Sequence, residues 1–357
     1  MLLQELFGTD LPIIQAPMAG VQDSALAVAV SNAGGLGSLP CAMLSPDALR
    51  LELTALRART TRPFNVNFFC HTQPEPSVEL ETVWRAKLSP YFAEYGIYAN
   101  AIAAGSGRQS FDEHAAEVLA EFRPAVGSFH FGLPSRVLLA KVRSWGGKIL
   151  SSATTVDEAR WLEAQGVDAV IVQGIEAGGH RGNFLSADTT LQLGTLALVP
   201  QVVDTVRIPV IAAGGIADAR GVAAAMALGA AGVQVGTAYL LCPEATTRAV
   251  HRAALKSDRA RATALTNLFT GRPARGIVNR LMQELGPMSD AVPPFPLATS
   301  ALAPLRAKAE GLGSDDFSPL WAGQNTSGCK EVSASILTKE LAMVVPRAQL
   351  RPTSSQN

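Results

Sequence analysis

Short apolar runs alternate with helical patterns along most of the chain. This alternation is typical of repeated βα units that build a parallel sheet. Most of the runs are apolar at nearly every position, which is expected for strands covered by helices on both faces. Eight runs are predicted as strands: Pro12–Met18, Gly35–Pro40, Phe64–Phe69, Ala125–Gly132, Lys148–Thr154, Ala169–Gly174, Pro209–Gly215 and Gly232–Thr237.

The segments between these runs carry helix-start signals. Ser45 stands as an N-cap before a proline and an acid. Thr155 and Glu158 have the spacing of a capping box, and Asp218 can cap a helix over 219–228. Eight βα units over about 240 residues predict an α/β fold of the TIM-barrel type, a (β/α)8 barrel. A doubly wound open sheet remains the alternative, because periodicity does not distinguish a closed sheet from an open one.

Two stretches break this rhythm. Residues 72–124 are rich in aromatic and charged side chains and are predicted to be mainly helical, with a glycine-rich joint at Ala104–Gly107. Residues 243–303 join an Ala/Arg-rich segment to a proline-rich one, and we expect a helical insertion or lid there. The predicted domains are a barrel at 1–242, the insertion at 243–303, and a C-terminal helix and tail at 304–357 that pack back on the barrel.

Two more predictions concern the C-terminal part of the chain. Ala301–Gly311 is predicted as one more helix that packs back on the barrel. The polar segment Arg347–Asn357 should be frayed.

The composition narrows the function classes. Of the 357 residues 48% are hydrophobic, and the formal net charge is +0, which gives no electrostatic argument for binding nucleic acid or an anionic membrane. Gly and Pro interrupt the apolar segments before the roughly 20 residues of a membrane span, and no secretory signal is apparent. The cysteines lie far apart without metal-ligand spacing, so we expect no metal. These features predict a cytoplasmic enzyme for a small molecule, as a monomer or homodimer.

The residues that could bind a ligand or transfer protons lie mainly where predicted strands end. The run Ala169–Gly174 leads into a glycine-rich turn that ends on His180. Glycines let backbone amides approach a ligand closely, and an imidazole beside them indicates an acid/base group. In a (β/α)8 barrel the loops after strands seven and eight form the usual phosphate cradle. Gly214-Gly215 and Gly236-Thr237 occupy those loops.

Three amide side chains indicate which kind of group is attached to the phosphate of the ligand. Asn67, Gln173 and Gln234 stand on otherwise apolar strands and need hydrogen-bond partners if they are buried. A planar heterocycle with carbonyl and imide groups would supply such partners. A heterocycle, one phosphate and a barrel together indicate FMN. A tight strand-to-helix turn without any ligand remains the simpler explanation of the glycines.

The motifs, taken together, resemble those of the nitronate monooxygenase family, formerly called 2-nitropropane dioxygenase. Each motif alone is weak, but their order along eight predicted strands is specific. The similarity covers nearly the whole chain and is weakest over residues 243–303. The matching stretches are Pro12–Gly20, Asn65–Phe69, Gln173–Gly182, Pro209–Ile216, Gly232–Thr237 and Leu320–Gln324.

The resemblance implies a non-covalent FMN and specific roles for the motif residues. His180 takes the position of the family's catalytic base, and His130 is a candidate for the substrate pocket. The implied reaction is oxidation of an alkyl nitronate, such as propionate 3-nitronate, by O2 to a carbonyl compound and nitrite, with detoxification as one use. The residues implied to hold FMN are Ala16, Pro17 and Met18 at the isoalloxazine face, Asn67 and Gln173 at its polar edge, and Gly178, Gly179, Gly214, Gly215, Gln234, Val235, Gly236 and Thr237 around the ribityl chain and phosphate.

Two other functions remain open at this point. An enoyl-thioester or quinone reductase of the same flavin superfamily, reduced by NAD(P)H, would share the Gly-Gly-His and phosphate motifs. A barrel that binds phosphate without a flavin would use the same cradle after strands seven and eight.

Overall fold

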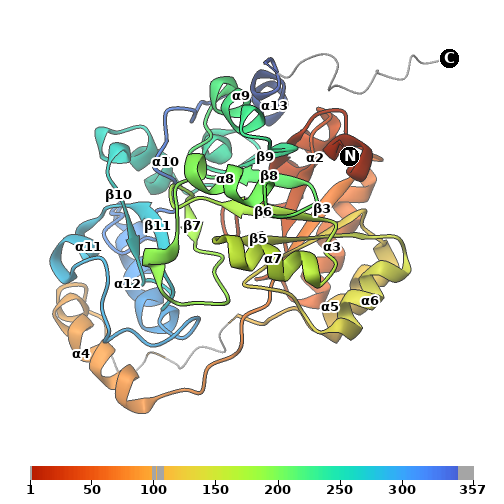
Figure 1. The fold of residues 1–357 in the computed structure, drawn as a ribbon. Helices are drawn as coiled ribbons and strands as arrows, with labels where there is room; N and C mark the ends of the chain where they lie inside the picture. The colour runs from red at the N-terminus through yellow and green to blue at the C-terminus, as the bar shows by residue number, and fades with distance from the viewer. Residues whose placement is uncertain (1, 99–101, 103–107, 345–357) are drawn as a thin grey trace.

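The computed structural model describes residues 2–98, 102 and 108–344. Within these residues, eight parallel strands follow one another in the order β1-β9-β8-β6-β5-β4-β3-β2 (Figure 1). A parallel bridge between Ile14 and Leu36 joins the two end strands, so the sheet closes into a (β/α)8 barrel and the open-sheet alternative is wrong. The strands are β1 Ile13–Gln15, β2 Gly37–Pro40, β3 Phe64–Phe69, β4 Val126–His130, β5 Lys148–Ala153, β6 Ala169–Gln173, β8 Val210–Ala213 and β9 Gly232–Val235.

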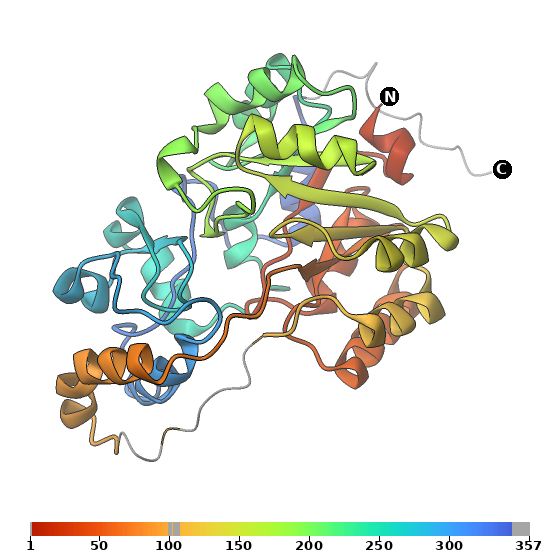
Figure 2. The same cartoon turned by 60° about the horizontal axis from the view of Figure 1, so that its bottom comes forward.

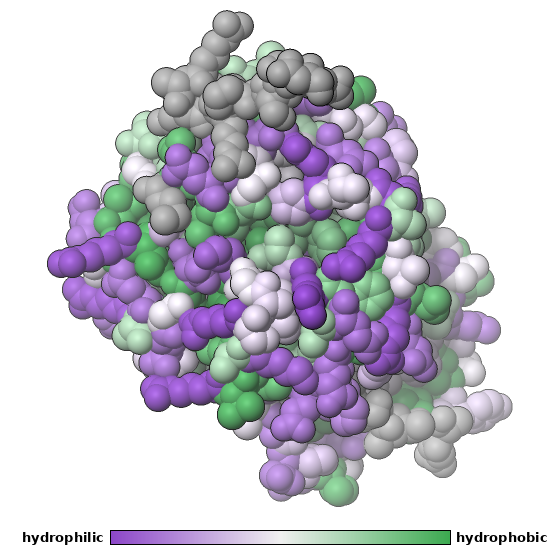
Figure 3. Space-filling view, turned by 90° about the vertical axis from the view of Figure 1, so that its right-hand side faces the viewer, coloured by the Kyte–Doolittle hydropathy of each residue, from purple (hydrophilic) through white to green (hydrophobic). Residues whose placement is uncertain are grey.

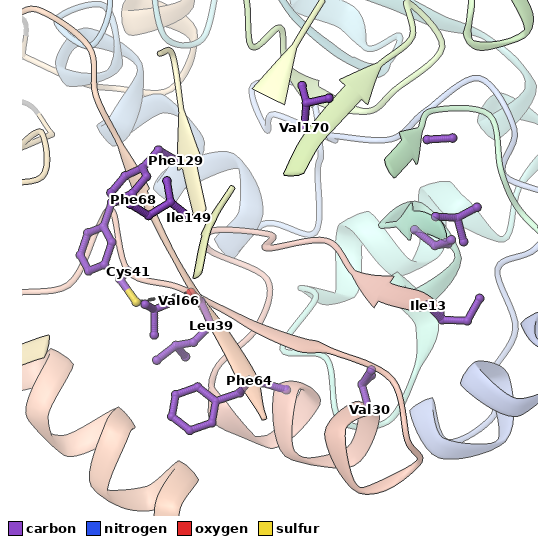
Figure 4. Packing of buried hydrophobic residues seen from close by; sticks show 14 of the residues in the cluster. Ile13, Val30, Leu39, Cys41, Phe64, Val66, Phe68, Phe129, Ile149 and Val170 are labelled. Carbon is purple, nitrogen blue, oxygen red and sulfur yellow. Dashed lines mark hydrogen bonds between the residues drawn. The ribbon is translucent and has the colours of Figure 1, made fainter. Parts of the chain in front are cut away.

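Neighbouring residues of these strands point to opposite faces, and both faces are buried. Ile13 and Val170 belong to the core between strands and helices, part of which Figure 4 shows. Ile14 and Ile171 point into the barrel and pack with the short helix α1, Leu3–Phe7. Helix α1 closes the amino end of the barrel, which leaves the opposite, carboxyl end for a site. The apolar strands read from the sequence therefore follow from burial on two sides.

Eight helices cover the outside of the barrel in the described part of the chain. The eighth, α13 (Ala334–Leu341), packs against α2 and α9, although almost a hundred residues separate it from the last barrel strand. Its Leu337 and Leu341 lie in the outer core. The other seven are α2 Ser24–Asn32, α3 Pro46–Arg59, α5 Glu113–Phe122, α6 Arg136–Ser144, α7 Val156–Ala164, α8 Thr195–Val203 and α9 Ala219–Ala227.

Most helix starts agree with the sequence signals. The side chains of Ser45 and Asp218 accept hydrogen bonds from the main chain of α3 and α9, and Thr155 accepts one from the amide of Glu158. The capping box is only half formed, however. The carboxylate of Glu158 instead accepts from Thr154 and from the amide of Phe184, so it ties α7 to the loop after β6.

A second unit stands beside the barrel, on the left of Figure 1 and Figure 2. It has its own core, in which Trp84 and Leu88 of α4 (Val78–Glu94) pack with Leu302 and Leu305 of α12 (Thr299–Gly311). It also contains a three-stranded sheet in the order β10-β11-β7. Its other elements are β7 Gly179–His180, β10 Thr263–Thr266, β11 Ala274–Ile277, α10 Ala249–Leu255, α11 Arg280–Leu285 and the 3-10 helix η4 Asp258–Arg261. The 3-10 helix η2 Thr189–Leu191 follows β7, and η3 Thr237–Leu241 follows β9 and packs in the outer core of the barrel.

This unit corrects two sequence expectations. The region 243–303 contains strands as well as helices, because β10 and β11 pair with each other and β11 pairs with β7. Helix α12, expected to pack on the barrel, packs against α4 instead. Its apolar stripe completes the core that the aromatic side chains of α4 begin. The predicted joint Ala104–Gly107 and the tail Arg347–Asn357 lie outside the described residues.

On the face shown in Figure 3, hydrophilic residues are spread over the whole surface with smaller hydrophobic groups among them. Among the helices of the described residues, none has the length and apolar character needed to cross a membrane.

Candidate active site

A cavity of about 190 Å³ lies at the carboxyl ends of the barrel strands. It brings together residues from almost every motif predicted from the sequence. Val235 is the exception: its side chain lies in the outer core, and its carbonyl accepts a hydrogen bond from Ala16. The predicted residues that line the cavity are Ala16, Pro17, Met18, Asn67, His130, Gln173, Gly178, Gly179, His180, Gly214, Gly215, Gln234, Gly236 and Thr237.

His180 lies where the barrel meets the second unit. It belongs to β7, and it pairs with Ala274 of β11 in the second sheet. Its Nε2 lies 2.9 Å from the hydroxyl of Thr270. Its main-chain carbonyl accepts hydrogen bonds from Gln173 Nε2 at 3.0 Å and from His130 Nε2 at 3.2 Å. The position of the imidazole is therefore fixed from both units.

Arg181 holds the turn between β6 and His180 in place through hydrogen bonds. Its side chain is fully buried and donates to the carbonyls of Gln173 and Gly174, each at 2.7 Å, and to Gln192. The side chain of Gln173 acts on the same turn, because its Oε1 accepts from the amide of Gly182. In this structure, then, the polar atoms of Gln173 hold the turn, whereas the sequence assigned them to the flavin edge.

The histidines of the cavity are held neutral. Burial lowers the pKa of His180 well below its usual value, and the positive charge of Arg108 lowers it further. Burial also lowers the pKa of His130 to about 3. A neutral imidazole can accept a proton at neutral pH, as a general base must.

A hydrogen-bond network fixes the loop after β1. Gln15 Nε2 donates to Gln22 Oε1 at 2.7 Å, and Gln15 Oε1 accepts from the amide of Ser38. Gln22 Oε1 also accepts from the amide of Met18 at 3.0 Å. Because these side chains are buried, the chain from Ala16 to Met18 keeps one conformation at the cavity wall.

The glycines of the predicted phosphate cradle are required by backbone shape. Gly214 and Gly215 have φ angles of +118° and +70°, which side-chain-bearing residues rarely adopt. A Cβ on Gly236 would lie 3.2 Å from the Cβ of Ala16. Thr195 joins the cradle to the loop after β6, because its hydroxyl lies 3.0 Å from the carbonyl of Gly214 and its amide donates to the carboxylate of Glu176. The backbone can therefore come close to a ligand at this edge of the cavity.

Gly178 has a different reason to be glycine. A Cβ there would lie 2.5 Å from the amide nitrogen of Gly323, in the segment after Trp321. That segment is fastened by hydrogen bonds from Gly323 to the hydroxyl of Thr237 and from Gln324 to the carbonyl of Glu176, both at 2.9 Å. The segment 321–325 thus forms part of the cavity wall.

Two polar atoms in the cavity suit a planar heterocycle. Gln234 Oε1 is buried without a hydrogen-bond partner in the described structure, and an orphaned acceptor is costly unless a ligand supplies a donor. Asn67 uses its Nδ2 on Ser128, which leaves its Oδ1 as the atom that can serve a ligand. Around Gly179 an added Cβ would meet nothing within 4 Å. The residues present therefore fit a flavin with hydrogen-bonding edges.

Sequence reasoning missed several residues of the cavity. Arg108, His251 and Trp321 all line it, and the ring of Trp321 lies 5.5 Å from that of His180. Phe295 lies 5.3 Å from His180 on another side. Trp321 had a signal, because it stands in the recognised stretch Leu320–Gln324. His251 and Phe295 come from outside the barrel motifs and reach the cavity through the packing of the second unit, whereas Arg108 lies just beyond the end of β3.

Comparison with known proteins identifies the family. The family model described as nitronate monooxygenase matches residues 1–343. The chain belongs to the nitronate monooxygenase family. A nitronate monooxygenase from Pseudomonas aeruginosa is 43% identical over 339 residues, which cover 94% of this chain and 96% of that protein.

Solved structures agree with this assignment. Nitroalkane oxidase from Streptomyces ansochromogenes is 40% identical, with a TM-score of 0.86 and coverage of 95% of this chain and 96% of that one. FabK from Thermotoga maritima is 28% identical, with a TM-score of 0.70 and coverage of 95% and 94%.

Membership of the nitronate monooxygenase family makes the chain an oxidoreductase and implies a flavin cofactor. This sets aside the barrel that binds phosphate without a flavin. Among the described residues, no group of three or more His, Cys, Asp or Glu side chains could hold a metal ion.

Proposed function

We propose that this enzyme uses FMN to oxidise alkyl nitronates, such as propionate 3-nitronate, with O2 to a carbonyl compound and nitrite. The observation that carries the proposal is a neutral histidine, His180, fixed at a cavity that a glycine cradle also lines. A small anionic substrate would lie between the two.

His180 would act as the base towards neutral nitroalkanes. The hydroxyl of Thr270 lies 3.4 Å from the carbonyl of Arg272 and can donate to it. Nε2 of His180 then donates to Thr270, and the lone pair of the imidazole is on Nδ1. Within the described residues Nδ1 makes no hydrogen bond, so it is free to take the α-proton of a substrate. A nitronate needs no such step, because it is already deprotonated.

The cavity residues would hold the cofactor without a covalent link. FMN, when bound, supplies electron transfer between the nitronate and O2. The chain from Ala16 to Met18 would line the ring, and Asn67 Oδ1 and Gln234 Oε1 would accept from its N–H groups. Gly214, Gly215, Gly236 and Thr237 would surround the phosphate with main-chain N–H groups, which bind anions without a basic side chain. Gly178 and Gly179 would border the ribityl chain.

The experiment has two readouts. The flavin released from purified protein by acid should be FMN by chromatography. With ethyl nitronate in air, the protein should consume O2 and release nitrite. Rapid flavin reduction by NADH without nitronate, together with no turnover of nitronate, would instead favour the enoyl-thioester or quinone reductase alternative.

We also propose a cytoplasmic location, a monomer or homodimer, and removal of toxic nitronates as the physiological use. Sedimentation at several concentrations would distinguish the two assembly states.

A further inference from the structure

The guanidinium of Arg108 lines the cavity without an anionic partner. Its Nη1 is buried and makes no hydrogen bond, and no carboxylate of the described residues forms an ion pair with it. The guanidinium carbon lies 5.4 Å from the ring centroid of Phe295. Arg108 is partly buried, and taking a cation out of water without a counter-ion is costly. Its place beside the cavity therefore favours a ligand that provides the negative charge.

The backbone of Arg108 is fixed, although its side chain is unpaired. Its carbonyl lies 3.0 Å from His71 Nε2, just beyond the end of β3. Three residues later, the amide of Phe111 donates to the carbonyl of Phe69 at 2.8 Å. Arg108 therefore belongs to the part of the cavity wall that extends β3.

This wall is remote from the predicted phosphate cradle. In the closed strand order, three strands separate β3 from β8 in either direction. The cradle glycines Gly214 and Gly215 follow β8. The anion that Arg108 would bind is therefore not the phosphate of the cofactor but belongs to the substrate.

The other basic side chains nearby are occupied or neutral. Arg272 donates to the carbonyl of Asn183 and lies 4.1 Å above the ring of Phe131. Burial lowers the pKa values of His71, His130 and His180, so these imidazoles carry no charge at neutral pH. Within the described part of the cavity, Arg108 is the positive charge available to a ligand.

Arg108 and His180 contact the same aromatic ring. Phe295 lies 5.4 Å from the guanidinium carbon of one and 5.3 Å from the imidazole of the other. We propose that Arg108 determines specificity by binding a carboxylate at the far end of the substrate while the nitronate end lies near His180. This inference rests on the nitronate oxidation proposed above. A guanidinium suits the task because its planar fork can bind both carboxylate oxygens.

The test compares two nitronates of similar length. Propionate 3-nitronate carries the second negative charge, and butyl 1-nitronate replaces it with an ethyl group. The proteins are the wild type, Arg108→Gln, Arg108→Lys, and the control Arg160→Gln, which changes an exposed arginine on α7. The flavin-loaded enzymes are compared by kcat/KM, KM and melting temperature.

The proposal predicts that Arg108→Gln lowers kcat/KM for propionate 3-nitronate at least tenfold, mainly through KM. The value for butyl 1-nitronate should change less than threefold. Arg108→Lys should restore part of the loss, because it keeps the charge without the fork, and Arg160→Gln should behave as wild type. Equal losses on both nitronates would overturn the proposal, since Arg108 would then serve the nitronate group or the fold. No loss on either would also overturn it.

A binding measurement separates this proposal from the proposed function. If the wild type oxidised neither nitronate, the proposed function would fail, and calorimetry with succinate would still test Arg108. Succinate should bind Arg108→Gln at least tenfold more weakly than the wild type, whereas Arg160→Gln should bind it as the wild type does. Equal binding of succinate by the wild type and Arg108→Gln would overturn the role of Arg108.

Discussion

His130 Nε2 lies 3.2 Å from the main-chain carbonyl oxygen of His180, and its Nδ1 lies 2.7 Å from the hydroxyl of Ser152. One neutral histidine therefore positions the other through the backbone. We expect His130→Leu to lower turnover of neutral nitroalkanes by about tenfold to a hundredfold, because small displacements of a reacting group cost this much. Flavin content should stay near the wild-type value. Steady-state rates with nitroethane provide the measurement.

Ser152→Ala is the matched control for this variant, because it removes the Nδ1 contact but leaves the bond to His180. It should retain most of the activity. If His130→Leu matched the wild type, the contact would have no positioning role.

The sequence predicted the barrel because burial on two faces leaves long apolar runs, and it predicted the glycine turn after β8 because special backbone angles demand glycine. It did not predict β10 and β11, since these four-residue strands mix polar and apolar side chains. It expected a C-terminal helix on the barrel but placed that helix at 301–311 instead of at α13, because the second unit separates α13 from β9. Arg108 and Phe295 carry no local signal. Only tertiary packing brings them to His180.

Substitution of Gln234 should affect the stability of the flavin-free protein and its affinity for FMN in opposite directions. The buried Oε1 of Gln234 lacks a partner in the ligand-free protein. Gln234→Leu should therefore leave the flavin-free protein as stable as the wild type or slightly more stable. The same variant should bind FMN about tenfold more weakly, because one hydrogen bond is lost. Melting curves without flavin and fluorescence titrations with FMN measure the two effects. Unchanged FMN affinity would count against contact between Gln234 and the flavin.

Substitution of Gly178 tests whether the segment 321–325 forms part of the cavity wall. Gly178→Ala would place a Cβ 2.5 Å from the amide nitrogen of Gly323. We expect a loss of about 1–3 kcal/mol in the free energy of unfolding, as for other overpacked sites, and weaker flavin binding. Gly311→Ala is the control, since nothing lies within 4 Å of its added Cβ. If the two substitutions changed the free energy of unfolding in urea equally, this role of the segment 321–325 would be contradicted.

Stability should fall as the pH falls below about 6.5. Burial lowers the pKa of His251 to about 4 and that of His130 to about 3. Between the unfolded pKa near 6.5 and these folded values, the unfolded chain binds more protons than the native one. Each of these histidines therefore removes about 1.4 kcal/mol of stability per pH unit as the pH falls.

The contribution of His251 to this pH dependence of stability can be measured separately. His251→Phe should flatten the dependence of unfolding free energy on pH between 6 and 4.5 by about one proton. His114→Gln, at an exposed histidine of α5, should leave the slope unchanged. A His251→Phe slope equal to that of the wild type would show that His251 does not contribute.

The most direct test of the account is the rate of flavin reduction in His180→Asn, measured anaerobically by stopped flow with nitroethane and with ethyl nitronate. Reduction by nitroethane should slow by about 10²–10⁴-fold, the usual contribution of a general base. Reduction by ethyl nitronate, which has no proton to lose, should slow far less, and the flavin should stay bound. Wild-type reduction by nitroethane in this variant would contradict the assignment of His180 as the base.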